Sequence, residues 1–189
     1  MGQALRELVQ AAAAVLELDE ACRQRTIVRT DRGGGSEDDI NWLLRQGYVI
    51  LVKNISWQRA HKLAQSVADW RVDPRDPQRQ AGWVTARLPY AAVTQQIAVR
   101  IQKTDGPWVY AVLVSSLPAD ALAQLVPDTV DPLWATVYAY DLRSGGLETI
   151  NRNDKQGLGL AKRNKRSFQA QEMLALRAQF AYNLLLWVR

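Results

Sequence analysis

Cysteine and histidine are nearly absent from the sequence: its 189 residues include one of each, Cys22 and His61. A single cysteine excludes an internal disulfide and a cysteine-rich zinc site, and it fits a protein of the reducing cytoplasm. A single histidine excludes metal sites built from several histidines. Because His61 lies in RAHKLAQSVADW, which has the apolar spacing of a helix, we interpret it as a structural residue.

Long uninterrupted apolar runs are also absent. The alanine-rich start, ALRELVQAAAAVLEL, carries Arg6 and Glu7 and predicts an amphipathic helix rather than a secretory signal. The final stretch, FQAQEMLALRAQFAYNLLLWVR, is interrupted by glutamine, glutamate and arginine, which favours a buried helix over a membrane span. We therefore expect a cytoplasmic location and no membrane partner.

Acidic residues are scarce near the C-terminus. The formal net charge is +5, but residues 143–189 contain nine Lys or Arg against three acids, so residues 1–142 are close to neutral. A positive excess confined to the last quarter of the chain predicts a polyanionic partner for that region. A solvated basic helix is the common alternative explanation.

The sequence does contain enough apolar material for a core, since 48% of its residues are hydrophobic and seven are tryptophan. Helical and strand patterns alternate in the first part. Helices are expected at about 3–17 and 37–46, the second ended by Gly47, and strands at 26–30 and 48–53. This alternation predicts an α/β fold in one domain, with or without an insertion.

The middle of the chain has a more β-like pattern. After a helix expected at 57–69, VDPRDPQRQAG (72–82) is polar, contains two prolines and predicts a loop. Three β-like runs follow, GWVTARLPY, TQQIAVRIQ and PWVYAVLVS, and KTDG joins the last two as a hairpin.

The remaining segments are mixed and then helical. A short helix at most is expected between 117 and 132, and residues 134–140 form either a strand or the start of a helix. Helices are expected at 147–156 and 167–188. These patterns divide the chain into a first core part at 1–56, an antiparallel β-rich insertion at 57–133, and a C-terminal core part at 134–189.

Two short stretches suggest chemistry. In IVRTDRGGGS, Asp31 ends a strand pattern and is followed by Gly33–Gly35, which permit backbone conformations closed to other residues, and by Ser36 as a helix cap. A carboxylate beside such backbone suits a metal ion or a phosphate. The alternative is a turn in which Asp31 bonds nearby amides.

The second stretch is YDLRSGGLETINRNDK, where Glu148 and Lys155 are two helical turns apart and can share one face of a helix. Tyr140 and Arg143 lie just upstream. These four residues fit a surface salt-bridge face. They also fit a metal-dependent phosphoryl-transfer site, with a carboxylate for the cation and cations for phosphate oxygens.

This stretch resembles the Y-x2-R-x3-E-x6-K signature of bacterial insertion-sequence transposases of the DDE class. Tyr140-x2-Arg143 and Glu148-x6-Lys155 match, although four residues separate Arg143 from Glu148 where the family has three. VRTDRGGGSEDDINWLL resembles the block with the family's second catalytic aspartate. The segment from Asn153 to the end resembles its C-terminal helical region.

The resemblance implies a ribonuclease H-like fold in which Asp31 and Glu148 correspond to the second Asp and the Glu. In the family these acids and a first Asp hold two Mg²⁺ (or Mn²⁺) ions about 4 Å apart, which act on a phosphodiester. Tyr140, Arg143 and Lys155 would position phosphates or a flipped base. A basic cluster would hold the DNA backbone through Lys162, Arg163, Lys165 and Arg166.

The first catalytic Asp of the family has no match in residues 1–30. Asp19 and Glu20 follow an amphipathic helix, and Asp38 and Asp39 are explained as helix-start acids. The chain thus resembles the C-terminal part of a transposase. Its expected partners are DNA at transposon ends and target, with a homodimer or a hetero-oligomer with full-length transposase, associated with the nucleoid. A non-catalytic DNA-binding remnant and an α/β protein without a nucleic-acid role remain as alternatives.

Overall fold

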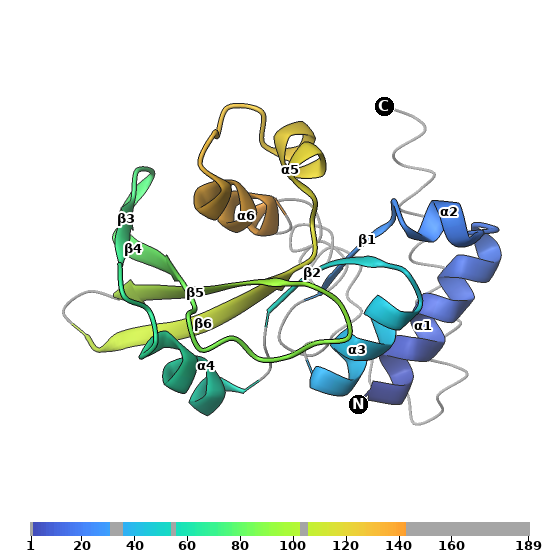
Figure 1. Ribbon diagram of the computed structural model, residues 1–189, viewed down its shortest axis with the longest axis horizontal. Helices are drawn as coiled ribbons and strands as arrows, with labels where there is room; N and C mark the ends of the chain where they lie inside the picture. Colours follow the sequence, from blue (N-terminus) through green and yellow to red (C-terminus); the bar gives the residue numbers. More distant parts are fainter. Residues whose placement is uncertain (1, 31–35, 54–55, 103–105, 143–189) are drawn as a thin grey trace, which may run out of the picture. The chain divides into compact units, whose positions relative to one another are not determined.

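The computed structural model describes residues 2–30, 36–53, 56–102 and 106–142 (Figure 1). The chain forms two compact units, Met1–Asp141 and Leu142–Arg189, and every described helix and strand belongs to the first. None of the helices within the described ranges has the length and apolar character that crossing a membrane requires.

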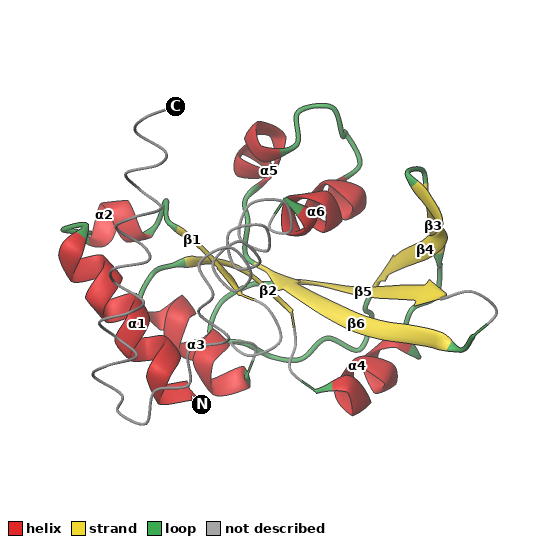
Figure 2. Cartoon of the chain, turned by 180° about the vertical axis from the view of Figure 1, so that it is seen from behind, coloured by secondary structure: helices red, strands yellow, loops and turns green. Residues whose placement is uncertain are grey.

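A six-stranded mixed sheet forms the centre of the first unit, in the order β1-β2-β6-β5-β4-β3 (Figure 2). β1 and β2 are parallel neighbours, and every other pair is antiparallel. The strands are β1 (Ile27–Thr30), β2 (Val49–Lys53), β3 (Arg71–Asp73), β4 (Asp76–Trp83), β5 (Gln95–Gln102) and β6 (Trp108–Ser115). One sheet therefore joins strands from residues 1–56 with strands from 57–133, because β2 pairs with β6.

Helices cover both faces of this sheet (Figure 1). On one face, a core cluster combines residues of α5 (Ala119–Leu125) and α6 (Pro132–Asp141) with Leu51, Ile97 and Leu113. On the other face, α3 (Glu37–Arg45) and α4 (Trp57–Ala64) pack against residues of the same strands that point the opposite way, such as Ile50 and Val112. The expected α/β class is confirmed.

The first helix lies on the α3 side of the sheet. In α1 (Gly2–Val15), Leu5 and Val9 pack against the cluster formed by α3 and α4. The Arg6 Nε donates to Asp39 Oδ1 at 3.3 Å. A further short helix, α2 (Glu20–Arg23), occupies what the sequence pattern suggested was a linker before β1.

Local sequence signals explain the ends of α3. Ser36 is its N-cap, and the Ser36 side chain accepts a hydrogen bond from the Asp39 amide. At the other end Gly47 has φ +83°, and the amides of Gly47 and Tyr48 donate to the carbonyls of Leu44 and Leu43. This Schellman geometry favours glycine.

Three boundaries expected from the sequence are wrong. Residues 72–82 are not a loop, since most of them form β3 and β4. Pro74 lies in the turn and Pro77 lies ahead of Arg79, where pairing to β5 begins, so neither proline removes a hydrogen bond from that pairing. Residues 84–90 are outside the sheet, and the Gln96 side chain bonds both the amide and the carbonyl of Leu88.

The helix expected at 57–69 ends at Ala64 instead. The Ser66 hydroxyl donates to the Leu63 carbonyl, and the chain then turns across Gly82 of β4. A Cβ at Gly82 would lie 2.3 Å from a Val67 methyl and 2.5 Å from the Asp69 carbonyl oxygen, so this close approach requires glycine. Of the two alternatives for 134–140, the structure has the helix, within α6. The helices expected at 147–156 and 167–188 lie outside the described residues.

Candidate functional site

Most of the residues singled out from the sequence lie outside the described ranges. These are Asp31, Arg143, Glu148, Lys155, Lys162, Arg163, Lys165 and Arg166. The structure does describe what precedes them: β1 ends at Thr30, directly before Asp31, and α6 ends at Asp141, two positions before Arg143. Thr30 is paired with Val52 of the parallel strand β2, whose last residue is Lys53.

A direct contact joins these two chain segments. The Arg29 Nη1 donates a hydrogen bond of 2.9 Å to the carbonyl oxygen of Ala139, across 110 positions of sequence. Arg29 alternates with Val28 along β1, so its side chain lies on the sheet face that carries α6, as does Ile27. Carbonyls in the last turn of a helix have no partner within the helix, and a cation there is favoured by the helix dipole. The end of β1 is thereby held to the end of α6.

Tyr140, the one described residue of the proposed signature, lies in the last turn of α6. Its side chain is buried in the core cluster on that face of the sheet. In the described unit Tyr140 is therefore a packing residue.

The acids near the N-terminus have structural partners. Asp19 caps α2 and accepts the Cys22 amide at 2.7 Å, a hydrogen bond that lowers the pKa of this carboxyl. Asp39 is buried, and its carboxylate accepts hydrogen bonds from the Ser36 hydroxyl and from Arg6. Asp38 is an exposed residue in the first turn of α3. Within the described ranges no group of three or more His, Cys, Asp or Glu side chains is arranged to hold a metal ion.

A buried polar network connects α6 to the β3–β4 hairpin; we call Asp73, Arg79, Tyr138 and Asp141 the α6 joint. The Asp73 carboxylate is fully buried and accepts hydrogen bonds of 2.5 Å from the Tyr138 hydroxyl and 2.5 Å from the Arg79 Nε. The Arg79 Nη1 also donates to Asp141 at 2.5 Å. Asp73, Arg79 and Tyr138 therefore have the bonded partners that burial requires, and the exposed Asp141 adds a second carboxylate to Arg79.

The network changes the titration of its members. Burial alone would raise the pKa of Asp73, but hydrogen bonds from Tyr138, the Arg75 amide and Arg79 outweigh it and hold that pKa below its usual value. For Tyr138, burial and then the hydrogen bond to Asp73 raise the pKa to about 12. At neutral pH the joint consequently contains an ionised Asp73 and a protonated Tyr138.

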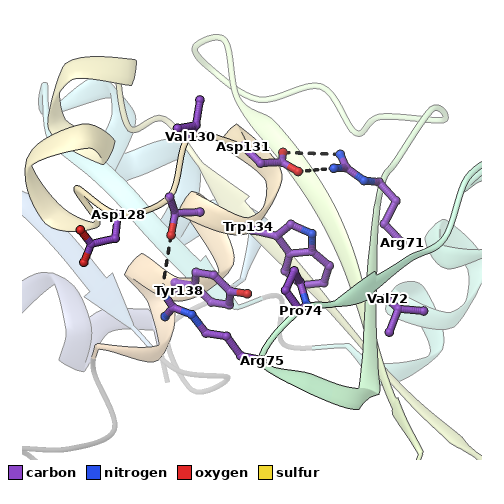
Figure 3. Close-up of a pocket in the computed structure, with 10 residues that line it drawn as sticks. Arg71, Val72, Pro74, Arg75, Asp128, Val130, Asp131, Trp134 and Tyr138 are labelled. Atoms are coloured by element: carbon purple, nitrogen blue, oxygen red, sulfur yellow. Dashed lines mark hydrogen bonds and ion pairs between the residues drawn. The ribbon is translucent and has the colours of Figure 1, made fainter.

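A cavity of about 390 Å³ opens beside the α6 joint, between β3 and the segment that leads into α6 (Figure 3). Arg71 forms an ion pair with Asp131 across it, and the Arg75 guanidinium lies 3.7 Å from the centre of the Tyr138 ring. Trp134 stacks on Tyr138 with ring centres 5.9 Å apart. Sequence analysis missed this cavity because it interpreted residues 72–82 as a loop. Arg71 is thus paired with an acid, whereas Arg75 lies on a ring and donates to the Thr129 hydroxyl.

No known family model matches the chain, and no curated protein sequence matches it significantly.

Proposed function

We propose that the chain is a DNA-binding protein derived from the DDE class of transposases, with a ribonuclease H-like sheet. The observation that carries this proposal is the hydrogen bond from Arg29 to the Ala139 carbonyl. It joins the residue two positions before Asp31 to the residue just before Tyr140. The sequence resemblance identified one motif around Asp31 and another that begins at Tyr140, separated by a long intervening segment. A site that uses residues of both motifs requires that the two segments lie close together.

The strand arrangement supports the same proposal. In the family the second catalytic Asp follows a strand of the sheet, and here the parallel strand β1 ends directly before Asp31. The Glu comes from a later helical region, and here α6 leads toward Glu148. The intervening β-rich segment is also a family feature, and β3–β6 occupy that part of the chain.

Asp31 and Glu148 are the proposed ligands of Mg²⁺ or Mn²⁺, and carboxylate oxygens are the donors that these ions prefer. When bound, such ions polarise a phosphodiester and activate the attacking oxygen. Tyr140, Arg143 and Lys155 position phosphates or a flipped base, and the core cluster around α6 fixes where Tyr140 lies. The four basic residues from Lys162 to Arg166 hold the DNA backbone by charge, and a DNA partner implies association with the cytoplasmic nucleoid.

A salt titration of duplex DNA binding tests the proposal. Each phosphate contact contributes about 0.9 to the slope of log K against log salt. A variant of the basic cluster with glutamine at all four positions should therefore reduce the slope by about three to four units. The four positions are Lys162, Arg163, Lys165 and Arg166. A matched control replaces four exposed basic residues of the first unit with glutamine: Arg25, Arg45, Lys62 and Arg87.

The control should keep most of the slope. An unchanged slope in the cluster variant, or equal losses in both variants, would contradict a DNA contact at residues 162–166. Absence of any salt-dependent binding would favour an α/β protein without a nucleic-acid role.

A nicking assay separates catalysis from binding. We expect the 189-residue chain by itself not to nick supercoiled plasmid in Mg²⁺ or Mn²⁺, because Asp31 and Glu148 supply a charge of −2 against two divalent ions. Of the candidate substitutes for the first Asp, Asp19 and Asp39 are already bonded within their own helix starts, and Asp38 is an exposed residue in the first turn of α3. Loss of several kcal/mol of transition-state stabilisation slows a reaction by about a thousandfold or more. Nicking that disappears in Glu148→Gln would show that a third ligand exists.

A further inference from the structure

The sheet has two outermost strands, β3 and β1, and their open edges differ. β3 has three residues, its register with β4 shifts between Val72 and Asp73, and Pro74 follows directly. Short strands, irregular pairing and prolines are devices that keep an edge from pairing with another chain. β1 contains no proline, and it pairs with β2 in regular register over its whole length. Of the two edges, β1 is therefore the one that a further strand can join.

Half of the backbone groups of β1 point away from β2. The Val49 amide donates to the Thr26 carbonyl, which fixes the phase of the ladder. Because the backbone groups of successive strand residues point to opposite sides, Val28 bonds to β2, whereas Ile27 and Arg29 direct their N–H and C=O groups to the open side. Neither of these two amides has a backbone partner within the described ranges. A further strand supplies such partners.

Helices cover β1 on both faces of the sheet. Ile27 packs against the cluster that contains α5 and α6, and Val28 packs against the cluster that contains α3 and α4. All four residues of β1 are half-buried. Strands that are covered on both faces have nearly continuous apolar sequences. A strand added beside β1 should therefore be apolar on both faces, as β2 is with the sequence VILVK.

A cavity of about 500 Å³ lies beside the start of β1, next to α5. Its apolar lining includes Ile27 and Val49, the first residues of β1 and β2, together with Ala121 and Leu125 of α5. Side chains on the same face of neighbouring strands lie side by side, so a residue paired next to Ile27 would project into this cavity. The volume is within the range of ordinary ligand sites, about 300–1,000 Å³, and accommodates a large apolar side chain.

Two charged residues of the same cavity indicate the chemistry of its occupant. Arg25 and Asp120 line it, and neither forms an ion pair among the described residues. A polypeptide can present groups of both signs beside an apolar side chain, whereas a lipid chain would leave both charges unused. The open amides and carbonyls of β1 favour the same occupant, because the backbone of a strand provides matching donors and acceptors.

We propose that the open edge of β1 binds an extended apolar segment of a partner protein, which joins the sheet as a further strand. The partner's backbone bonds to Ile27 and Arg29, and one of its large apolar side chains fills the cavity next to α5. This proposal goes beyond the function proposed above, since neither DNA nor the candidate metal ligands take part in the contact.

Fluorescence anisotropy with a labelled peptide tests the proposal. The probe has the sequence of residues 48–53, YVILVK, with added terminal lysines for solubility, because this sequence already pairs with β1 and is apolar on both faces. We expect saturable binding. A control peptide with N-methyl groups on alternate amides keeps the same side chains but loses backbone donors, and it should bind at least about tenfold more weakly.

Amide hydrogen exchange locates the contact. Addition of the probe should slow exchange at the Ile27 and Arg29 amides, which point to the open side. The Val28 amide is already bonded to β2 and should change little. Protection elsewhere in the chain without protection at Ile27 and Arg29 would show that the peptide binds at a different place, and the proposal would be wrong.

The cavity provides a matched pair of variants on α5. Ala121→Leu fills part of the cavity and should weaken binding of the probe about tenfold, because the probe can no longer bury an apolar side chain there. Ala123→Leu makes the same change at an exposed position of α5 that does not line the cavity, and it should bind like the unmodified chain. Leucine is nearly as favourable as alanine in a helix, so both variants should fold.

Three further outcomes would overturn the proposal. The first is no binding of the probe up to about 1 mM peptide. The second is equal binding of the N-methylated control, or an equal loss of binding in both leucine variants. The third is a dimer of the chain alone in sedimentation experiments with its Ile27 and Arg29 amides protected, since the occupant would then be a second copy. The DNA titration is independent of all three, so the two proposals can fail separately.

Discussion

Two places in the first unit bring arginine guanidinium groups onto aromatic rings, and they differ in what surrounds the charge. At the α6 joint and its adjoining cavity, Arg79 has two carboxylate partners, whereas Arg75, which also lies on the Tyr138 ring, donates to the Thr129 hydroxyl. Near the start of β6 the Arg100 guanidinium lies on the Trp70 and Trp108 rings, and its side-chain partner is the neutral Gln80 amide. Lys53, at the end of β2, forms no ion pair among the described residues. A buried carboxylate thus accompanies Arg79, while Arg100 has none among the described residues.

This difference separates charges that hold elements together from charges that do not. Buried charges that are fully paired hold elements together, and removing one partner leaves the other uncompensated. Lys53 and Arg100 are half-buried and form no ion pair among the described residues, so losing either charge leaves no carboxylate uncompensated there. The comparison therefore predicts large losses of stability for changes at the α6 joint and small ones for changes at Lys53.

The largest effect is expected for Asp73→Asn. This change leaves Arg79, whose side chain is 14% exposed, with Asp141 as its single carboxylate partner. The free energy of unfolding should fall by about 3 kcal/mol, at the lower end of the range for breaking a buried ion pair. Urea denaturation measures it. A loss of unfolding free energy smaller than that expected for an exposed ion pair would show that the two regions do not differ in this way.

Tyr138→Phe should have the next largest effect, about 1–3 kcal/mol, because a hydrogen bond to a buried carboxylate is lost. It should also change the pH dependence of stability. The pKa of Tyr138 is raised to about 12, so its contribution is fully present below the unfolded-state value near 10 and is lost as pH rises toward 12. Unfolding measured across that window should show a smaller alkaline loss in the variant.

At acid pH the contribution of Asp73 to stability changes in the opposite direction: it is lost as pH falls. Since the pKa of Asp73 is lowered in the fold, its contribution to stability is present above the usual aspartate pKa of 3.8 and is lost as pH falls through the lower, folded-state pKa. Asp73→Asn should therefore flatten the fall in stability below about pH 4. An equally steep acid loss in the variant would assign that loss to other carboxyls.

Arg71→Gln should cost less than about 1 kcal/mol, because its ion pair with Asp131 is exposed on the arginine side. This variant is the control for Asp73→Asn, since both remove one charge from the same strand, β3. A loss as large as that of Asp73→Asn would mean that the cavity in Figure 3 is part of the joint.

The smallest effect on stability is expected at Lys53. Lys53→Gln should change the free energy of unfolding by no more than about 0.5 kcal/mol, as for surface positions without a special role. Thermal melting and urea denaturation measure this. A clear destabilisation would show that Lys53 contributes to packing.

Sequence analysis predicted part of the candidate site. It identified the strand that ends before Asp31, the helix cap at Ser36 and the turn at Gly47, because each depends on residues within one or two turns of chain. It identified Tyr140 as a DNA-contact residue, which stays a prediction, but it did not predict that this side chain is buried in the core cluster around α6. Burial depends on which distant elements pack around a residue, and no local pattern reports that.

The sequence by itself determined the α/β class, the positions of β1, α3, β2, β5 and β6, and the concentration of positive charge in residues 143–189. Only the tertiary structure decided that residues 72–82 form strands, that 134–140 are helical, and that Arg29 meets Ala139. It also decided which arginines are paired and which are not. The physical reason is that helix periodicity and capping are local, whereas strand pairing, burial and charge compensation depend on partners contributed by distant parts of the chain.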